Sequence, residues 1–294
     1  MTIATLPLLM AAGSGVAAPG FDLSRKLAAR QLQPLPMVFV LTLASVPLFG
    51  AAVALAGGVH IVPAYFAPAT ASLLLNLAAN LAFVESVRIA PLSLTVPLLS
   101  LTPVFTTGLG VVVLGERPAG IVWLGVALVA GRAFALHWTG EGARDAGAPR
   151  LPTLLAHRGG WLIAGTACLW SLTIPLDKLA IGRASAPFHG LFLTAGGAVG
   201  TFAILACSRQ LDEVRGVRGA WVPLAAALVA STLELGLQLA AIRVVLVSVV
   251  ETVKRGMGNL LAVAVGRLVF REALTWGKLA AVAAMATGGA LILL

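Results

Sequence analysis

The segment LVSVVETVKRGMGNLLAVAVGRLVF, residues 246–270, is long and apolar yet carries two adjacent cations, Lys254 and Arg255. A bilayer core about 30 Å thick needs roughly 20 apolar helical residues per crossing, so this segment is long enough to span it. Ionisable side chains at such depth are costly, and those that occur face a cavity and mark a path for substrate, ions or protons. The segment therefore predicts a membrane-spanning helix with a functional site inside the membrane.

The composition of the whole chain is that of a polytopic membrane protein. Hydrophobic residues make up 59% of the 294 residues and charged residues 11%, and the mean hydropathy is +1.00. These values argue against a water-soluble fold. The net charge of +9 is spread singly over short loops, which does not indicate a nucleic-acid surface. Cys168 and Cys207 lack metal-ligand spacing and are interpreted as buried thiols.

Loops marked by proline, glycine and charge divide the chain into ten expected spans. The first apolar run lacks a basic n-region and a persuasive cleavage site, so we expect it to be retained as a helix. One linker-like stretch, TGEGARDAGAPRLPT, lies near the middle of the chain. We therefore expect two five-helix repeats, residues 1–138 and 157–294, joined by residues 139–156. The expected spans are residues 4–28, 33–56, 62–89, 91–114, 118–136, 157–181, 187–207, 218–243, 246–270 and 274–294.

Short motifs recur in the same order in the two halves. RIAPLS at residues 88–93 aligns with RVVLVS at 243–248, and RKLA at 25–28 aligns with DKLA at 177–180. Because each repeat has five crossings, the second must enter the membrane in the opposite orientation. Inverted repeats are typical of transporters, in which the binding site lies near the midplane at the repeat interface. The expected fold class is an all-α polytopic membrane protein with ten transmembrane helices in a five-plus-five inverted repeat.

Counting inward from the loop between the eighth and ninth spans places Glu234 and Lys254 at the same depth. At about 1.5 Å per residue both lie roughly 14–16 Å from that loop, near the bilayer centre. Gln238 shares a helical face with Glu234, and Glu251 precedes Arg255 by one turn. Two acids thus face two bases across one hairpin. The constellation is either a substrate-binding site or a buried ion network that holds the helices together.

A neutral polar wall is expected from the other half of the cavity. Asn76 and Asn80 share a face of the third span, and Ser100 lies at matching depth on the fourth. Trp170 and Thr173, one turn apart on the sixth span, can supply an aromatic wall and a hydroxyl, or can face lipid instead. One charged wall and one neutral polar wall suit a substrate that has one anionic end.

Three further polar residues are expected at the membrane interface. Asp177 and Lys178 lie close to a helix end, where a lysine can extend its ammonium to water, and a functional role for this pair stays open as the alternative. His189 lies in the first turn of the seventh span, where a histidine is more often an interfacial hydrogen-bonding group than a proton relay.

Three stretches of the sequence resemble the EamA-type branch of the drug/metabolite transporter superfamily. They are APLSLTVPLLSLTPVFTTGLGVVVLGERP at residues 90–118, WSLTIPLDK at 170–178 and FREALTWGKLAAVAAMATGGALILL at 270–294. The resemblance covers essentially the whole chain and implies ten helices in a five-plus-five inverted repeat that works by alternating access. Substrates in this family range over amino acids, sugars, nucleotide conjugates and drugs, so the resemblance alone does not name the cargo.

A narrower similarity concerns the two cations. Val253-Lys254-Arg255 is similar to the V-K-R run of organic-phosphate antiporters in the same superfamily, which implies that Lys254 and Arg255 bind an anionic group. Leu99 stands where those antiporters carry another phosphate-binding lysine. A carboxylate or a phospholipid-like head group therefore stays open beside phosphate.

The sequence carries no motif of an enzyme, a metal site or a nucleotide cofactor. Gly-x-Ser-x-Gly and His-Glu-x-x-His motifs, carboxylate-rich metal clusters and glycine-rich loops with lysine are all absent from it. We therefore expect no enzyme and no cofactor, but a secondary-active inner-membrane exporter or exchanger of a small metabolite with an anionic group. A counter-substrate or a proton, carried by Glu234 or Glu251, is the expected coupling partner. Two alternatives stay open: an exporter of amino acids or hydrophobic drugs with structural charges, and a lipid-head-group translocase or accessory membrane subunit.

Charge and resemblance disagree about orientation. The side that holds the central linker carries 14 Lys and Arg residues and the opposite side four. The positive-inside rule then makes the linker cytoplasmic and leaves both termini outside. Many ten-helix relatives are expected to have their termini inside. We prefer the charge count because it acts physically on this chain during insertion.

Overall fold

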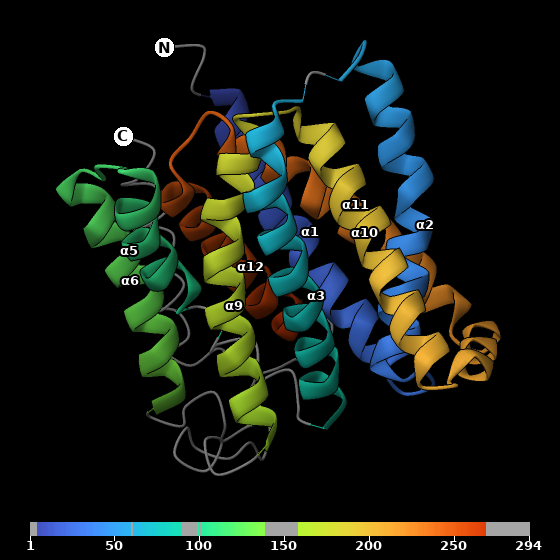
Figure 1. Cartoon of the computed structure of the whole chain (residues 1–294). Coiled ribbons are helices and arrows are strands. Elements are labelled where there is room, and N and C mark those ends of the chain that lie inside the picture. The colour runs from blue at the N-terminus through green and yellow to red at the C-terminus, as the bar shows by residue number, and fades with distance from the viewer. Residues whose placement is uncertain (1–4, 60, 90–98, 100, 139–157, 269–294) are drawn as a thin grey trace.

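A computed structural model describes residues 5–59, 61–89, 99, 101–138 and 158–268, and no strand occurs among them. The helices stand side by side as a bundle (Figure 1). In chain order the elements are α1 (Thr5–Ala28), α2 (Pro34–Leu55), the 3₁₀ turn η1 (Pro63–Tyr65), α3 (Phe66–Ile89), α5 (Thr102–Leu114), α6 (Gly120–Trp138), α9 (Arg158–Ile181), α10 (Ala186–Cys207), the 3₁₀ segment η2 (Leu211–Arg218), α11 (Trp221–Ile242) and α12 (Val247–Leu268).

Six of the described helices are long and apolar enough to cross a membrane. They are α1, α2, α3 together with η1, α9, α10 and α11, and α5 and the first part of α6 are shorter apolar helices. Large apolar side chains such as Leu55 and Val112 are more than 80% exposed on the outside of the bundle. An apolar exterior suits contact with lipid and supports a multi-pass membrane protein.

Part of the expected architecture lies outside the described residues. The tenth expected span, 274–294, and the linker, 139–156, fall there entirely, and so does the first part of the fourth span, 91–114. The total of ten helices therefore stays a prediction.

Proline and serine mark the starts of α2 and α10. Pro34 opens α2, and Pro187 lies in the first turn of α10, where its missing N–H leaves no hydrogen bond unmade. Ser185 precedes α10 and its side-chain oxygen accepts a hydrogen bond from the Phe188 amide at 3.3 Å. The observed bounds of both helices lie within one residue of the expected ones at each end.

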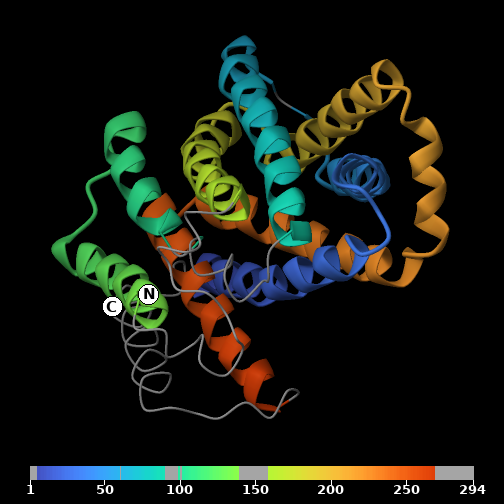
Figure 2. The same ribbon diagram turned by 90° about the horizontal axis from the view of Figure 1, so that it is seen from below.

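The helices of the two halves interleave. α1 packs mainly on α11 and α12, α3 packs mainly on α9, and α2 packs on α10. Figure 2, a view from below, shows α1 (blue) crossing α12 (orange-red). In the expected repeat, α1, α2 and α3 of the first half correspond to α9, α10 and α11 of the second. Under this correspondence the α1–α11 contact is equivalent to the α3–α9 contact, and the α2–α10 contact is equivalent to itself. The main helix pairings thus have counterparts under exchange of the halves.

Gly15 lets α1 approach α12 at the level of Lys254. A Cβ atom at this position would lie 2.8 Å from the Lys254 carbonyl oxygen and 2.9 Å from its Cα. Only glycine permits such an approach, as is common where helices pack closely in membranes. This contact fixes the depth of Lys254 relative to the first helix.

The expectation of buried thiols is wrong. Cys168 and Cys207 are both exposed on the outside of the bundle. An apolar run in a membrane helix does not imply burial in protein, because lipid accepts apolar side chains equally well.

Candidate functional site

A cavity of about 180 Å³ lies between the halves and is lined by residues of α1, α2, α3, α9, α10, α11 and α12. Nine of the ten residues selected from the sequence line it. Ser100, the tenth, lies outside the described residues. The nine are Asn76, Asn80, Trp170, Thr173, Glu234, Gln238, Glu251, Lys254 and Arg255.

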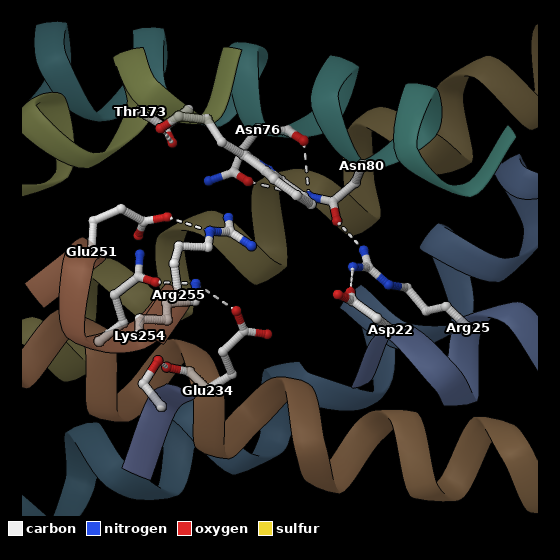
Figure 3. Close-up of polar contacts among 12 residues, drawn as sticks. Asp22, Arg25, Asn76, Asn80, Thr173, Glu234, Glu251, Lys254 and Arg255 are labelled. Carbon is white, nitrogen blue, oxygen red and sulfur yellow. Dashed lines mark hydrogen bonds and ion pairs between the residues drawn. The ribbon is translucent and has the colours of Figure 1, made fainter. Parts of the chain in front are cut away.

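One wall of the cavity carries two ion pairs, one between α11 and α12 and one within α12 (Figure 3). Lys254 Nζ lies 2.6 Å from Glu234 Oε1 and donates a hydrogen bond to Gln238 Oε1, also at 2.6 Å. Arg255 Nε donates to Glu251 Oε1 at 2.7 Å, one helical turn away. The side chains of Lys254 and Glu251 are 8% and 1% exposed. The Lys254–Glu234 contact matches the common depth obtained by counting residues.

The opposite wall is charged, which corrects the expectation of a neutral one. Asp22 and Arg25 of α1 line the cavity, and Arg25 Nη2 lies 2.6 Å from Asp22 Oδ1. Arg25 Nη1 donates to Asn80 Oδ1 at 3.0 Å, and Asn80 donates in turn to Asn76 Oδ1 at 3.1 Å (Figure 3). The asparagines therefore extend an ion pair instead of forming a wall by themselves.

Arg25 is held by aromatic rings as well as by hydrogen bonds. Its guanidinium carbon lies 3.9 Å from the ring centroids of both Phe21 and Phe83, and 5.8 Å from that of Trp170. Such cation–π contacts strengthen when water is excluded, and Arg25 is only 2% exposed. The expected first span, residues 4–28, has Arg25 near its end. The signal available in the sequence was an acid and a base three residues apart, Asp22 and Arg25, inside an apolar run.

Trp170 and Thr173 both face the cavity, so the lipid-facing interpretation of these residues is wrong. The Trp170 ring packs on Phe83 with centroids 5.4 Å apart. Thr173 Oγ1 donates to the Trp170 carbonyl oxygen at 2.9 Å, an interaction within the helix. α9 therefore contributes an aromatic surface and a small polar group to the cavity.

Asp177 and His189 are buried in protein, which overturns their interfacial interpretation. The two side chains are 1% and 0% exposed, and His189 Nε2 lies 3.0 Å from Asp177 Oδ1. Asp177 also lines the cavity. The reason is packing: residues near the end of a membrane helix are covered when a neighbouring helix starts beside them, as α10 does here.

Lys178 is partly exposed, and its ammonium binds two loop residues. Its Nζ donates to Glu116 Oε1 and to the Val245 carbonyl oxygen, each at 2.7 Å. Glu116 accepts a hydrogen bond from the Val247 amide at 3.2 Å, at the positive end of α12. Gly115, at φ 64°, ends α5 in the left-handed conformation and places Glu116 there. This network ties three helix ends together beyond the cavity.

The described residues that line the cavity include three cations and four carboxylates. Each cation lies within 2.7 Å of a carboxylate oxygen, and the fourth carboxylate, Asp177, is paired with His189. Among the described residues, no group of three or more His, Cys, Asp or Glu side chains is placed to hold a metal ion. The cations are Arg25, Lys254 and Arg255, and the carboxylates are Asp22, Asp177, Glu234 and Glu251.

Comparison with known proteins agrees with the resemblance seen in the sequence. Residues 5–136 match the sequence profile of the EamA-like transporter family. Twenty-six solved protein chains are significantly similar in structure. One is a crystal structure of a protein that shares 13% identity, with a TM-score of 0.73 over 97% of this chain and 95% of that one. At this identity the likeness concerns the fold alone. No curated protein matches the sequence significantly.

Proposed function

Because the chain belongs to the EamA-like transporter family of the drug/metabolite transporter superfamily, we propose that it is a secondary-active transporter of a small metabolite with an anionic group. The cavity between the halves is the proposed transport site. The protein lies in the inner (plasma) membrane and works as an exporter or an exchanger.

Alternating access between two inverted five-helix repeats is the proposed mechanism. The equivalence of the α1–α11 and α3–α9 contacts between the two halves supports this mechanism, because an inverted repeat produces such paired contacts. In this mechanism the halves rock around the cavity, and the ion pairs on its two walls separate and re-form as the substrate binds and leaves.

The Arg255–Glu251 pair favours a substrate that also carries a cationic group. Arg255 uses only Nε for Glu251, so its Nη groups have no partner among the described residues. Glu251 Oε2 is buried and likewise has no hydrogen-bond partner there. A guanidinium has five N–H donors and a carboxylate accepts at both oxygens. One adjacent donor and one adjacent acceptor are thus unused, which suits a carboxylate and an ammonium on one small molecule.

Charge energetics point the same way. An anion without an ammonium would compete with the internal carboxylates, and a buried charge that loses its partner costs about 3–5 kcal/mol. A zwitterion offers an opposite charge to each member of an ion pair, so neither buried charge is left uncompensated when the pair separates. The cavity volume of about 180 Å³ is below the roughly 300–1,000 Å³ of pockets for drug-sized ligands. A zwitterion of amino-acid size is therefore the substrate that this site fits best.

Matched compounds test the substrate class on purified protein. Alanine, leucine and phenylalanine would each be compared by thermal shift with the 2-hydroxy acid that lacks the ammonium and the amine that lacks the carboxylate. Ligand binding raises stability by RT ln(1 + [L]/Kd), so each amino acid should raise the melting temperature more than the matching 2-hydroxy acid or amine does. Glycerol 3-phosphate would test the anionic-phosphate alternative. Uptake of a binding amino acid into proteoliposomes would then show transport.

Variants of Arg255 and Glu251 test whether this ion pair binds the amino acid. Arg255→Lys keeps the charge but loses the planar fork, and Glu251→Gln loses the charge, so both should weaken amino-acid binding. Arg88→Gln breaks a partly exposed ion pair outside the cavity and should leave binding intact. Equal shifts from the hydroxy acids and amino acids, or a response to glycerol 3-phosphate alone, would contradict the zwitterion assignment.

A further inference from the structure

Four buried side chains form a hydrogen-bonded chain that ends at the proposed transport site. Tyr65 OH lies 3.0 Å from His189 Nδ1, and His189 Nε2 lies 3.0 Å from Asp177 Oδ1. Ser72 Oγ donates to the same Asp177 oxygen. Tyr65, Ser72 and His189 are 0% exposed and Asp177 is 1% exposed. The chain joins η1, α3, α9 and α10, and therefore both halves of the protein.

The chain runs from one end of the bundle to the cavity. Tyr65 directly follows residues 61–64, which are exposed, and its ring is enclosed by Phe66, Phe188 and Phe192 at centroid distances of 5.3 to 5.5 Å. At the other end, Asp177 lines the cavity. The hydrogen-bonded chain thus extends from the proposed transport site to Tyr65, a buried residue next to the exposed loop.

Both protonation states of the imidazole fit these contacts. With one proton, His189 donates from Nε2 to Asp177 and accepts at Nδ1 from the Tyr65 hydroxyl. With two protons, it donates to Asp177 and to the Tyr65 oxygen, because a hydroxyl both donates and accepts. No hydrogen bond of the chain is lost when the proton is gained.

The charge of the cavity gives an independent reason to bind a proton. Three cations stand against four carboxylates among the described lining residues, a difference of one negative charge while His189 is neutral. An unbalanced charge within a membrane is costly. One proton on the Asp177–His189 pair balances the cavity.

Other charged groups around the pair are already engaged. Glu234 on α11 binds Lys254 on α12, Glu251 binds Arg255, and Lys178 turns away from the cavity to bind Glu116. The helix α2, which packs on α10, carries no titratable side chain, and neither does the described length of α5.

We infer that the Asp177–His189 pair is the proton-binding site that couples this transporter to a proton gradient, with Tyr65 as the relay to the nearer end of the bundle. A proton that reaches the Tyr65 oxygen replaces the one that Tyr65 gives to Nδ1, and the Nε2 proton can pass to Asp177 and into the cavity. No covalent bond other than O–H and N–H changes. This inference rests on the proposed transport function and moves the coupling role from Glu234 and Glu251 to a different pair.

Solid-state NMR on histidine-labelled protein in lipid tests proton binding without any substrate. Imidazole ¹⁵N shifts separate the neutral tautomers from the imidazolium, and loss of a signal in His189→Gln assigns it among the four histidines. We expect His189 to change reversibly from the neutral imidazole to the imidazolium when the pH is lowered. Asp177→Asn should abolish that change. Ser86→Ala removes another buried α3–α9 contact, to the Gly159 carbonyl oxygen, and should leave it intact. A His189 that stays neutral throughout would overturn the inference, whatever the substrate proves to be.

Proteoliposomes test the coupling. With the amino acid that the binding screen identifies, uptake driven by a pH gradient and exchange at equal pH would be measured separately. His189→Gln should lose the driven uptake and keep exchange. Tyr65→Phe retains the ring and the fold and should slow the driven uptake only. If either variant lost both activities in parallel, or neither, the chain would be a structural contact between helices and the inference would be wrong. If no amino acid is transported at all, the NMR result still decides proton binding, and only the proposed function fails.

Discussion

Replacing Lys254 by methionine removes one charge from a buried pair and keeps most of the side-chain volume. The ammonium lies 2.6 Å from Glu234 Oε1 and 2.6 Å from Gln238 Oε1. Without it, the Glu234 carboxylate faces the cavity with no cation in contact, and the Gln238 oxygen loses its donor. We expect the fold to survive and its stability to fall.

The expected loss follows from burial. Removing one member of a buried ion pair costs about 3–5 kcal/mol. The Glu234 side chain is 16% exposed to the cavity and can be partly solvated there, which points to the lower end, about 3 kcal/mol. The double variant Lys254→Met/Glu234→Gln leaves no uncompensated charge. It should therefore regain about 2 kcal/mol relative to the sum of the single changes.

Unfolding by sodium dodecyl sulfate in mixed micelles would measure these energies. Tryptophan fluorescence is a suitable signal because the chain has six tryptophans, one of which, Trp170, lines the cavity. The four proteins of the double-mutant cycle would be compared after reversibility and two-state behaviour are checked. Ligand binding would be measured on the same samples, and the double variant should stay folded yet bind the amino acid more weakly.

A surface pair provides the control. Arg215 and Asp212 lie 3.3 Å apart with both side chains 85% exposed, so the cycle Arg215→Met and Asp212→Asn should give a coupling energy close to zero. The reasoning is refuted if Lys254→Met costs less than about 1 kcal/mol, or if the two cavity changes are simply additive.

Two further predictions concern packing and orientation. Gly15→Ala should destabilise the protein by about 1–3 kcal/mol because the new Cβ would meet the Lys254 backbone. Gly20→Ala in the same helix is the control: its Cβ meets nothing, so it should cost far less stability. Equal effects of the two changes in the unfolding assay would contradict the close approach of α1 to α12. Exposed Glu213 would be replaced by cysteine in a background of Cys168→Ser and Cys207→Ser. If the charge count sets the cytoplasmic side, this cysteine should resist an impermeant thiol reagent in intact cells. Labelling in intact cells would show that the orientation is the opposite one.

The sequence by itself determined the class of protein and much of one cavity wall. Apolar length predicts membrane helices because the bilayer core has a fixed thickness. The cost of ionisable groups in that core marked Lys254 and Arg255 as cavity residues. Helical geometry then placed Glu251 one turn from Arg255 and gave Glu234 the depth of Lys254, since both relations depend only on the rise per residue and a short loop.

The tertiary structure alone decided which distant helices share the site. Arg25 has the sequence context of a basic residue at a helix end, yet the packing of α3 on α1 encloses it between the rings of Phe21 and Phe83. His189 and Tyr65 are 124 residues apart, and nothing local to either predicts their hydrogen bond. Periodicity reports which face of a helix avoids lipid, but the choice of neighbour depends on side-chain packing along the whole chain, such as the close approach that Gly15 allows. The pairing of Asp177 with His189, and with it the proposed proton site, is therefore a property of the folded bundle.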